Sequence, residues 1–260
     1  MTSDWNAALY HRLSGPQQAW GARVLARLPL SGGERVLDLG CGSGRLSATI
    51  AESLPRGQLV GLDASAAMLD AASAWLRERR SRARLVRGDG AALPFATAFD
   101  AVFSGATFHW ILDHPRLFRE IHRVLLPGGR LEAQCGGQGN LARLLERTHA
   151  QMGSQRYASF FRDWTDPWVF AGIAETTERL HAAGFVDVDV SLEPAPTSLG
   201  SQDAYGDFLA CVCVRHHIER LPAGDRASFV GGLADAAARD DPPFTLDYWR
   251  LNISARRPVR

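Results

Sequence analysis

Hydrophobic positions in the first half of the chain follow two alternating patterns. Between residues 34 and 135, short apolar runs of strand length alternate with segments in which apolar residues recur every three to four positions. The runs lack the polar alternation of a half-exposed strand, which indicates strands covered by helices on both faces. The pattern therefore predicts an α/β fold with a parallel sheet. After a first strand around Val36 to Leu39, strands are predicted at 58–62, 83–87, 100–104 and 130–135, and helices at 43–53, 65–79 and 115–126.

The flanking segments follow a looser pattern. Residues 4–29 have apolar positions at helical spacing, and Ser14-Gly15-Pro16 divides them into two predicted short helices. Strict alternation at 185–192 suits a strand near the edge of a sheet. The remaining segments are predicted to be mainly helical at 138–183, helical at 203–220 and 224–239, and extended at 244–255.

Composition narrows the class of protein. The chain has 260 residues, of which 46% are hydrophobic and 22% charged, and its net charge is +1. This balance argues against disorder and gives no charge-based reason to expect a nucleic-acid or membrane partner. All 29 basic residues are arginine, so P-loop phosphate binding, kinase-type catalysis and lysine Schiff bases are excluded, because each needs an amine.

Cysteine usage indicates the compartment. The four cysteines show no spacing typical of a disulfide framework, and one of them, Cys41, lies in a glycine-rich turn. No basic and apolar leader precedes residue 30, and no apolar run approaches the ~20 residues of a membrane span. We therefore expect a reduced, cytoplasmic protein.

The glycine-rich turn lies in residues 34–45, Glu-Arg-Val-Leu-Asp-Leu-Gly-Cys-Gly-Ser-Gly-Arg. A strand that turns on glycines into a helix lets backbone N–H groups approach a ligand, because no Cβ stands in the way. Dinucleotide-binding dehydrogenases place glycines at positions one, three and six of this turn. Counted from Gly40, position six is Arg45, and the third glycine falls at position five. The turn predicts a nucleotide-type site and disfavours a nicotinamide cofactor.

Two further acids follow predicted strands. Asp63 closes the second strand, where a carboxylate accepts ribose hydroxyls or, alternatively, caps the next helix. Asp89 follows the third strand in Gly-Asp-Gly-Ala-Ala-Leu-Pro-Phe. With Phe99-Asp100 and the segment 125–131, these five ordered motifs resemble class I S-adenosylmethionine-dependent methyltransferases of the small-molecule type. Phe108-His109-Trp110 and the segment 134–140 resemble the group that includes trans-aconitate methyltransferase.

This resemblance implies a Rossmann-like, seven-stranded, mostly parallel sheet with helices on both faces and a helical cap over the substrate pocket. One methyltransferase domain would span 1–260. Its parts would be a lid at 1–30, a cofactor-binding core at 34–135, cap segments at 138–183 and 200–240, and final strands at 185–192 and 244–255.

The resemblance also implies S-adenosylmethionine as cofactor and S-adenosylhomocysteine as product. Gly40, Cys41 and Gly42 would lie along its methionine and ribose parts. The expected contacts elsewhere are Asp38 and the Ser104 backbone at the methionine end, Asp63 at the ribose, Met68, Asp89 and Gly90 at the adenine, and Tyr10 and Gln18 as lid contacts or ordinary helix residues.

The acceptor side of the site is less defined. His109 follows the fourth strand, where ligands of parallel sheets bind, and it either contacts substrate, acts as a base or makes structural hydrogen bonds. Trp110 is an apolar wall for the substrate or a core residue. Arginines that could pair a substrate carboxylate are Arg12, Arg156 and Arg162.

Other polar residues carry no predicted role. His114, His122, His149 and His181 are interpreted as helix-face residues. Cys211 and Cys213 with His216 and His217 are spaced around a helix instead of converging, so we expect no metal. The arginine-rich segment 77–84 lacks interleaved aromatics and disfavours nucleic acid.

The sequence predicts methyl transfer to a small molecule, first to an oxygen nucleophile such as a carboxylate, which needs no base. One alternative is an O- or C-methyltransferase of a phenol, quinone or natural product with His109 as base. Another is a protein that binds the cofactor without methylating, and a dehydrogenase is third. Asp63→Ala is expected to weaken cofactor binding several-fold with the fold intact. The acceptor, the pathway and the oligomeric state stay open.

Overall fold

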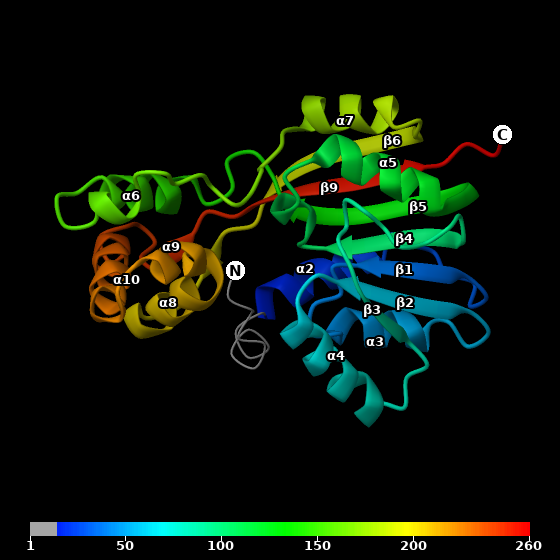
Figure 1. Cartoon of the computed structure of the whole chain (residues 1–260), viewed down its shortest axis with the longest axis horizontal. Helices are drawn as coiled ribbons and strands as arrows, with labels where there is room; N and C mark the ends of the chain where they lie inside the picture. The colour runs from blue at the N-terminus through cyan, green and yellow to red at the C-terminus, as the bar shows by residue number, and fades with distance from the viewer. Residues whose placement is uncertain (1–14) are drawn as a thin grey trace. The chain divides into compact units, whose positions relative to one another are not determined.

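The computed structural model describes residues 15–260, and the chain divides into two compact units (Figure 1). Within the described residues, the sheet unit comprises 15–138, 168–193 and 250–260, and the helical unit comprises 139–167 and 194–249. The segment 168–183, expected in the cap, therefore belongs to the sheet unit. The predicted roles of 1–30 as a lid and of the helical segments as a cap stay predictions.

The sheet unit is built on seven strands in the order β3-β2-β1-β4-β5-β9-β6. Pairings β3–β2, β2–β1, β1–β4 and β4–β5 are parallel, whereas β9 runs antiparallel to β5. The strands are β1 Arg35–Leu39, β2 Gln58–Asp63, β3 Arg84–Arg87, β4 Phe99–Gly105, β5 Leu125–Gly136, β6 Val186–Pro194 and β9 Trp249–Arg256. The predicted seven-stranded, mostly parallel sheet is confirmed, and β6 lies at its edge as its alternation predicts.

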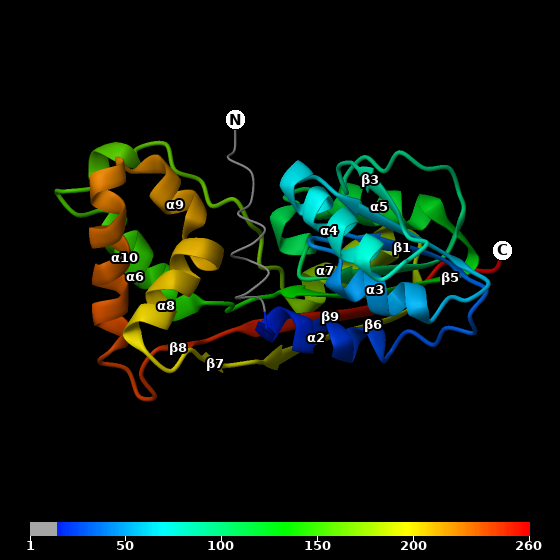
Figure 2. The ribbon, with the colours of Figure 1, turned by 90° about the horizontal axis from the view of Figure 1, so that it is seen from below.

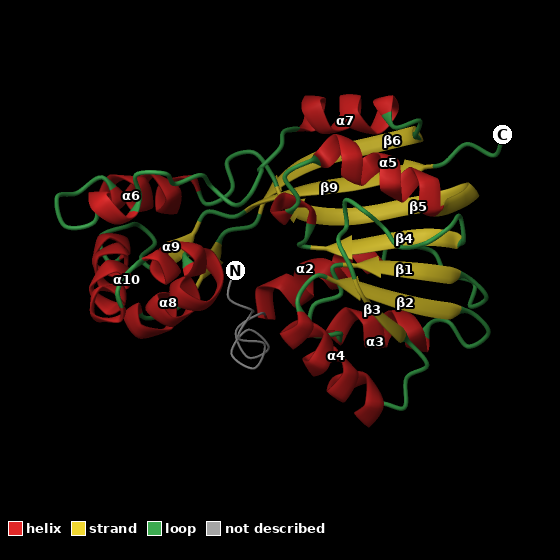
Figure 3. Cartoon of the chain, in the orientation of Figure 1, coloured by secondary structure: helices red, strands yellow, loops and turns green. Residues whose placement is uncertain are grey.

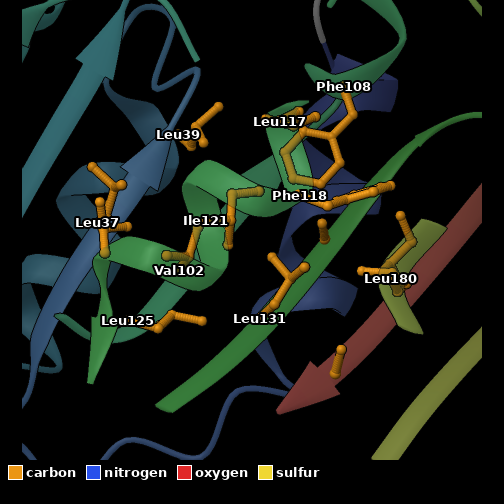
Figure 4. Close-up of a cluster of buried hydrophobic side chains, with 14 of the residues drawn as sticks. Leu37, Leu39, Val102, Phe108, Leu117, Phe118, Ile121, Leu125, Leu131 and Leu180 are labelled. Atoms are coloured by element: carbon orange, nitrogen blue, oxygen red, sulfur yellow. The ribbon is translucent and has the colours of Figure 1, made fainter. Parts of the chain in front are cut away.

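Helices cover both faces of this sheet because neighbouring strand residues point to opposite sides. Val36 and Phe103 pack in one cluster with α2 and α3, whereas Leu37 and Val102 pack in the other with α5. Figure 2 shows α2 and α5 on opposite sides of the sheet, and Figure 4 shows the second cluster. The helices of this unit are α2 Gly15–Leu25, α3 Arg45–Glu52, α4 Ala66–Glu78, the 3-10 helix η1 Phe108–Trp110, α5 His114–Val124 and α7 Ile173–Ala182.

The boundary between α5 and β5 differs from the prediction. The helix ends at Val124, and β5 begins at Leu125 instead of residue 130. The Arg257 guanidinium donates to the carbonyl oxygens of His122 at 3.0 Å and Leu125 at 2.6 Å, which satisfies acceptors at the helix end. Leu125 pairs with Phe99, and a register shift absorbs the Pro-Gly-Gly that follows.

The helical unit consists of short helices and one strand pair (Figure 3). Residues 153–172 are mostly turns and irregular segments, so the helical prediction for 138–183 is wrong there. The elements are α6 Ala142–Met152, the 3-10 helix η2 Ala158–Phe160, β7 Thr197–Ser198, α8 Gln202–Phe208, the π-helix η3 Leu209–Cys213, α9 Arg215–Arg220, α10 Ala223–Ala237 and β8 Thr245–Leu246.

Two predicted elements are divided. The helix expected at 203–220 contains η3 and a break at Val214, whose N–H donates to the Leu209 carbonyl five residues earlier. The strand expected at 244–255 is split, because β8 pairs with β7 outside the main sheet. The rest forms β9, which is buried at four successive positions, 250–253, because helices cover both faces of its sheet.

Candidate active site

The glycine turn at the end of β1 has a conformation that other residues adopt poorly. Gly40, Gly42 and Gly44 all have positive φ, at 78°, 52° and 79°. The N–H groups of Gly40 and Cys41 both donate to the Leu62 carbonyl of β2, at 2.7 and 3.0 Å. A Cβ at Gly40 would lie 2.0 Å from Oγ1 of Thr107. Leu62 of β2 and Thr107, which follows β4, therefore contact the turn from its two sides, and no side chain fits at its first glycine.

The third glycine, Gly44, lies at the position that distinguishes this turn from the glycine turn of a dehydrogenase. Gly44 is the N-cap of α3, and a Cβ there would lie 3.0 Å from the Cβ of Ala72 in α4. A glycine at this position thus allows α3 and α4 to pack closely. The N-terminus of α3, at Arg45, lies beside the turn, and the N–H groups of a helix N-terminus favour an anionic or polar ligand group.

Asp63 at the end of β2 is tied to this turn. Its Oδ2 accepts a hydrogen bond from the Gly42 N–H at 2.9 Å, and its Oδ1 accepts one from the Ser65 N–H at 2.9 Å. The helix cap itself is Ser65, whose hydroxyl accepts from the Met68 N–H. Each carboxylate oxygen has two acceptor sites, so Asp63 can fix the turn and still accept ligand hydroxyls.

A pocket opens beside the glycine turn. Five residues predicted to contact the cofactor line it: Gln18, Asp38, Gly40, Cys41 and Gly42. The Nε2 of Gln18 is buried and has no hydrogen-bond partner within the described part of the chain. An amide donor in this position fits a polar ligand in the pocket. The lining is completed by Ser43, Arg45, Leu46, Phe103, Gly105 and Ala106.

Asp38 is a titratable residue in the lining of the pocket. Its side chain is buried, and its Oδ2 accepts a hydrogen bond from the Ser47 hydroxyl at 2.6 Å. Burial raises the pKa of Asp38 to about 7, with a further rise from the negative charge of Asp63 and an opposing effect of Ser47. A cation in the pocket would favour the ionised carboxylate.

The residues expected at the adenine follow β2 and β3. Met68 is buried in the first turn of α4. Asp89 is exposed, and its Oδ1 accepts from the Ala91 N–H at 2.8 Å. Gly90 is buried, and a Cβ there would lie 2.6 Å from Ile111. These three positions lie at the carboxyl ends of neighbouring strands, as predicted from the order of the motifs.

Ser104, whose backbone is expected at the methionine end of the cofactor, lies near the end of β4. It is fully buried in β4, its hydroxyl donates to the Leu39 carbonyl at 2.7 Å, and it does not line the pocket. The next residue, Gly105, does line the pocket. The contact between the Ser104 backbone and the cofactor stays a prediction.

His109 lies in η1, at the carboxyl end of β4. The Gly136 N–H points at His109 Nδ1, 3.3 Å away, and a backbone N–H can only donate. Nδ1 is therefore the acceptor, and the ring proton resides on Nε2. Burial, with a smaller effect of the Arg250 and His114 charges, lowers the pKa of His109 well below its usual value. The imidazole is neutral and presents an N–H donor.

Aromatic side chains surround this imidazole. The rings of Trp110 and Phe170 lie 5.1 and 5.7 Å from it, and Trp168 meets Trp110 edge-on at 5.8 Å. The Val169 N–H donates to the His109 carbonyl at 2.8 Å. The segment from Trp168 to Phe170 thus adds apolar surface beside Trp110.

His114 is not a simple helix-face residue. It is buried, and Arg179 Nη1 donates to its Nδ1 at 3.1 Å. Its Nε2–H therefore donates to the Phe108 carbonyl at 3.0 Å. Arg179 is in turn paired with Glu175. This chain of contacts from α7 through α5 holds η1, and so holds the backbone that carries His109.

Several predicted residues lie in the helical unit or outside the described residues. Arg156 is exposed in the helical unit and pairs with Asp225 at 2.6 Å. Arg162 is exposed in the same unit. Tyr10 and Arg12 lie outside the described residues.

Two further features of residues 15–260 concern metal ligation and membrane spanning. Within that range, no group of three or more His, Cys, Asp or Glu side chains is placed to hold a metal ion. In the same part of the chain, no helix has both the length and the apolar character needed to cross a bilayer.

Comparison with known proteins identifies the family. The profile of a family described as a methyltransferase domain matches residues 36–129. A trans-aconitate 2-methyltransferase from Methylobacterium radiotolerans is 31% identical over 269 aligned residues, which cover 98% of this chain and 99% of that protein. The chain belongs to the S-adenosylmethionine-dependent methyltransferases, in the trans-aconitate 2-methyltransferase group.

Further comparisons agree with this assignment. A second protein of the same name, from Paracidovorax citrulli, is 30% identical and matches 98% of both chains. Phosphoethanolamine N-methyltransferase 2 of Haemonchus contortus, solved with S-adenosylhomocysteine, shares the fold at a TM-score of 0.62 and 18% identity, covering 97% of this chain and 57% of that one. The methyltransferase therefore uses S-adenosylmethionine, and the glycine cradle, the Gln18 amide and the acids beside them fit this cofactor.

The titration of Asp38 predicts a pH dependence of cofactor affinity. The carboxyl is mostly protonated below pH 7 and charged above it, and the cofactor is cationic. We expect the affinity for S-adenosylmethionine to rise about tenfold between pH 5.5 and 8.5, a change of about 1.4 kcal/mol. Calorimetric titration of the wild type and Asp38→Asn across this range checks the prediction, and an equal rise in both would contradict it.

The raised pKa of Asp38 also makes the stability of the protein without cofactor depend on pH, and here the effect of rising pH is unfavourable. The unfolded Asp38 ionises near pH 4, whereas the folded one holds its proton until about pH 7. Stability from this group is therefore full at low pH and is lost as the pH rises from 4 to 7. Asp38→Asn should raise the melting temperature at pH 8 more than at pH 5.

Proposed function

We propose that this methyltransferase transfers a methyl group from S-adenosylmethionine to a carboxylate oxygen of a small organic acid. The products are a methyl ester and S-adenosylhomocysteine. The observation that carries this proposal is the hydrogen bond from the Gly136 N–H to His109 Nδ1, which makes His109 a donor. A carboxylic acid is already ionised at neutral pH, so its methylation needs a group that positions it and no group that removes a proton.

The cofactor supplies a methyl group bound to a positively charged sulfur, which is already a good leaving group. The protein has to align the acceptor oxygen with the methyl carbon and the sulfur and to exclude water. In the proposed site, the His109 Nε2–H holds the acceptor carboxylate. Trp110, Trp168 and Phe170 exclude water from that side.

The remaining residues hold the cofactor. We assign the methionine end to Asp38, Gln18 and the Gly105 backbone, and the ribose to Asp63. Gly40, Cys41 and Gly42 form the cradle between these two ends, and the adenine side consists of Met68, Asp89 and Gly90. Support for the residues of the methionine end and the cradle comes from the pocket that they line, and support for Asp63 comes from its hydrogen bond with Gly42.

The names of the relatives support the same acceptor class, because those proteins are named for methylating trans-aconitate, a carboxylic acid. The test is transfer of a labelled methyl group from S-adenosylmethionine into a panel of acids, phenols and quinones. The panel includes trans-aconitate and simpler di- and monocarboxylic acids. Base-labile ester label from an acid supports the proposal. Label only in phenols or quinones, or no label in a protein that binds the cofactor, overturns it.

His109 variants separate the donor role from the role of a base. Glutamine keeps an N–H donor near the Nε2 position but cannot take up a proton, whereas leucine provides neither. We therefore expect His109→Gln to retain about a tenth of kcat/KM and His109→Leu to lose about a hundredfold or more. Steady-state kinetics with the best acid of the panel, with cofactor affinity as the control, checks this.

The result expected of a base is different. If a phenol were the acceptor and His109 its base, glutamine and leucine would reduce kcat equally. Equal losses in the two variants, with unchanged cofactor affinity, would therefore remove the donor role.

A further inference from the structure

The 3-10 helix η1, which carries His109, is too short to keep its own place. It has three residues, and its backbone hydrogen bonds are those of a single turn. The Trp110 N–H donates to the Thr107 carbonyl at 2.9 Å, and the N–H of Ile111 donates to the carbonyl of Phe108 at the same distance. Hydrogen bonds of this kind have poorer geometry than those of an α-helix. The position of His109 therefore depends on contacts that other elements make with η1.

Hydrogen bonds from β5, from the segment before α7 and from α5 reach η1. The Gly136 N–H at the end of β5 donates to His109 Nδ1 at 3.3 Å, and the Val169 N–H donates to the His109 carbonyl at 2.8 Å. The third contact is the His114 Nε2–H of α5, which donates to the Phe108 carbonyl at 3.0 Å. The first two donors are backbone groups, whereas the third is a side chain. Its presence therefore depends on the residue type at this position.

His114 makes this contact because a guanidinium selects its tautomer. Arg179 Nη1 of α7 donates to His114 Nδ1 at 3.1 Å, and an arginine has no acceptor. Arg179 is held in turn by its ion pair with Glu175, one turn earlier in the same helix. The two helices that carry these residues, α5 and α7, lie side by side (Figure 1). The guanidinium thus keeps the proton off Nδ1 and directs it to Nε2, which faces the Phe108 carbonyl.

The surroundings of His114 keep this hydrogen bond from being replaced by one to water. The residue is 2% exposed, and its ring lies 5.9 Å from the ring of Phe118. Figure 4 shows Phe108 and Phe118 in the same buried cluster. Burial is the largest cause of a lowered pKa of His114, so the imidazole is neutral at neutral pH. Loss of the Nε2–H would therefore remove the hydrogen bond between α5 and η1 without a substitute.

We infer that His114 is a positioning residue for methyl transfer: through the Phe108 carbonyl it keeps η1, and with it the Nε2–H of His109, where the acceptor is held. This inference rests on the proposed function in taking His109 as the group that holds the acceptor. Transfer needs the acceptor oxygen, the methyl carbon and the sulfur in line, and a displacement of about 1 Å costs up to about 100-fold in rate. Arg179 acts one step further away, because it selects the tautomer of His114.

Two substitutions of His114 separate its contact with η1 from its other contacts. Glutamine places an amide N–H₂ near the Nε2 position and so keeps a donor to the Phe108 carbonyl. Asparagine is shorter, so its amide stays near the Nδ1 position, beside Arg179, and does not reach Phe108. The matched control is His122→Gln, because His122 lies in the same helix and packs against Phe185, away from η1. Affinity for S-adenosylhomocysteine and the melting temperature report on folding.

Kinetics use the best acceptor of the methyl-transfer panel, whatever its class. We expect His114→Asn to lower kcat about 30-fold, His114→Gln to retain about a third of it, and His122→Gln to stay within about twofold of the wild type. In a His109→Leu background, His114→Asn should cost no more than about threefold further, because both changes act on the same group. A full 30-fold loss in that background, or equal losses in His114→Asn and His114→Gln, overturns the inference.

A second measurement needs no methyl transfer. ¹⁵N NMR spectra of the histidine-labelled, S-adenosylhomocysteine-loaded protein report the tautomer of each imidazole. The wild type should show His109 and His114 as Nε2–H tautomers, and His114→Asn should leave His109 without a single tautomer, because η1 shifts away from the Gly136 N–H. A wild-type His114 in another form at neutral pH, or an unchanged His109 signal in His114→Asn, overturns the inference. If His114→Asn does not fold, the wild-type spectrum and His114→Gln decide, and a 30-fold loss of kcat in His114→Gln overturns it.

The outcomes separate this inference from the proposed function. Methyl transfer to phenols or quinones alone, or to nothing in the panel, with the expected change of the His109 signal in His114→Asn, would refute the proposed function and retain the positioning role. Methyl esters formed from acids, with independent losses in the His114 and His109 variants, would refute the inference and retain the function.

Discussion

Replacement of Gly40 by alanine is expected to weaken S-adenosylmethionine binding by at least about 100-fold and to lower the stability of the protein by about 2–4 kcal/mol. Two causes add. The φ of 78° is strained for a residue with a Cβ, and that Cβ would lie 2.0 Å from Oγ1 of Thr107 and 2.4 Å from its Cγ2. Relief of this clash must move either the turn or the segment after β4, and both border the cofactor pocket.

Calorimetric cofactor binding and thermal unfolding measure the two effects. Gly33→Ala is the matched control, because Gly33 precedes β1, has an ordinary φ and has open space around its Cβ position. A double variant, Gly40→Ala with Thr107→Gly, removes the clash but not the backbone strain, so it should recover part of the loss. Near wild-type affinity in the Gly40→Ala single variant would show that the turn is not the cofactor cradle.

The parts of the fold that the sequence predicts are those fixed by local patterns. Buried apolar runs locate β2 and β4 to within one residue, and the glycine turn locates the start of α3 to within two. The predictions are wrong where a contact with a residue far away in the sequence determines the bounds of an element. The early start of β5 depends on Arg257, 132 positions from the Leu125 carbonyl that it binds. The short β8 depends on pairing with β7, which no local pattern reveals.

The same distinction between local patterns and distant contacts applies to the residues of the site. The positions of Gly40, Asp63 and Asp89 could be predicted, because strand order alone brings the ends of neighbouring strands together. Thr107 could not be predicted, because its importance comes from its contact with Gly40, 67 positions away.

Asp63 shows how the structure changes a prediction made from sequence. An acid at a strand end was expected to bind ribose and to contribute little to the fold. Instead, its two oxygens accept the N–H groups of Gly42 and Ser65, so Asp63→Ala should loosen the turn as well as remove a ligand. Asp63→Asn is the sharper variant, because it keeps the shape and places an amide N–H₂ against one of these donors.

We expect Asp63→Asn to weaken S-adenosylmethionine binding by about 30-fold or more, since hydrogen bonds to a charged group contribute about 1.5–3 kcal/mol each. The melting temperature should fall by several degrees, because a backbone donor of the turn loses its acceptor. Calorimetry and thermal unfolding measure both effects. Asp70→Asn is the control, as an exposed acid on α4, and it should leave both unchanged.

The ribose contact can be separated from the effect on the turn with a modified ligand. S-adenosylhomocysteine and its 2′-deoxy analogue differ in one hydroxyl, and in the wild type the analogue should bind about tenfold more weakly. If Asp63 accepts that hydroxyl, the difference shrinks to about twofold or less in Asp63→Asn, because the two changes remove the same interaction. An unchanged tenfold difference would leave Asp63 as a turn residue alone and assign the ribose to another group.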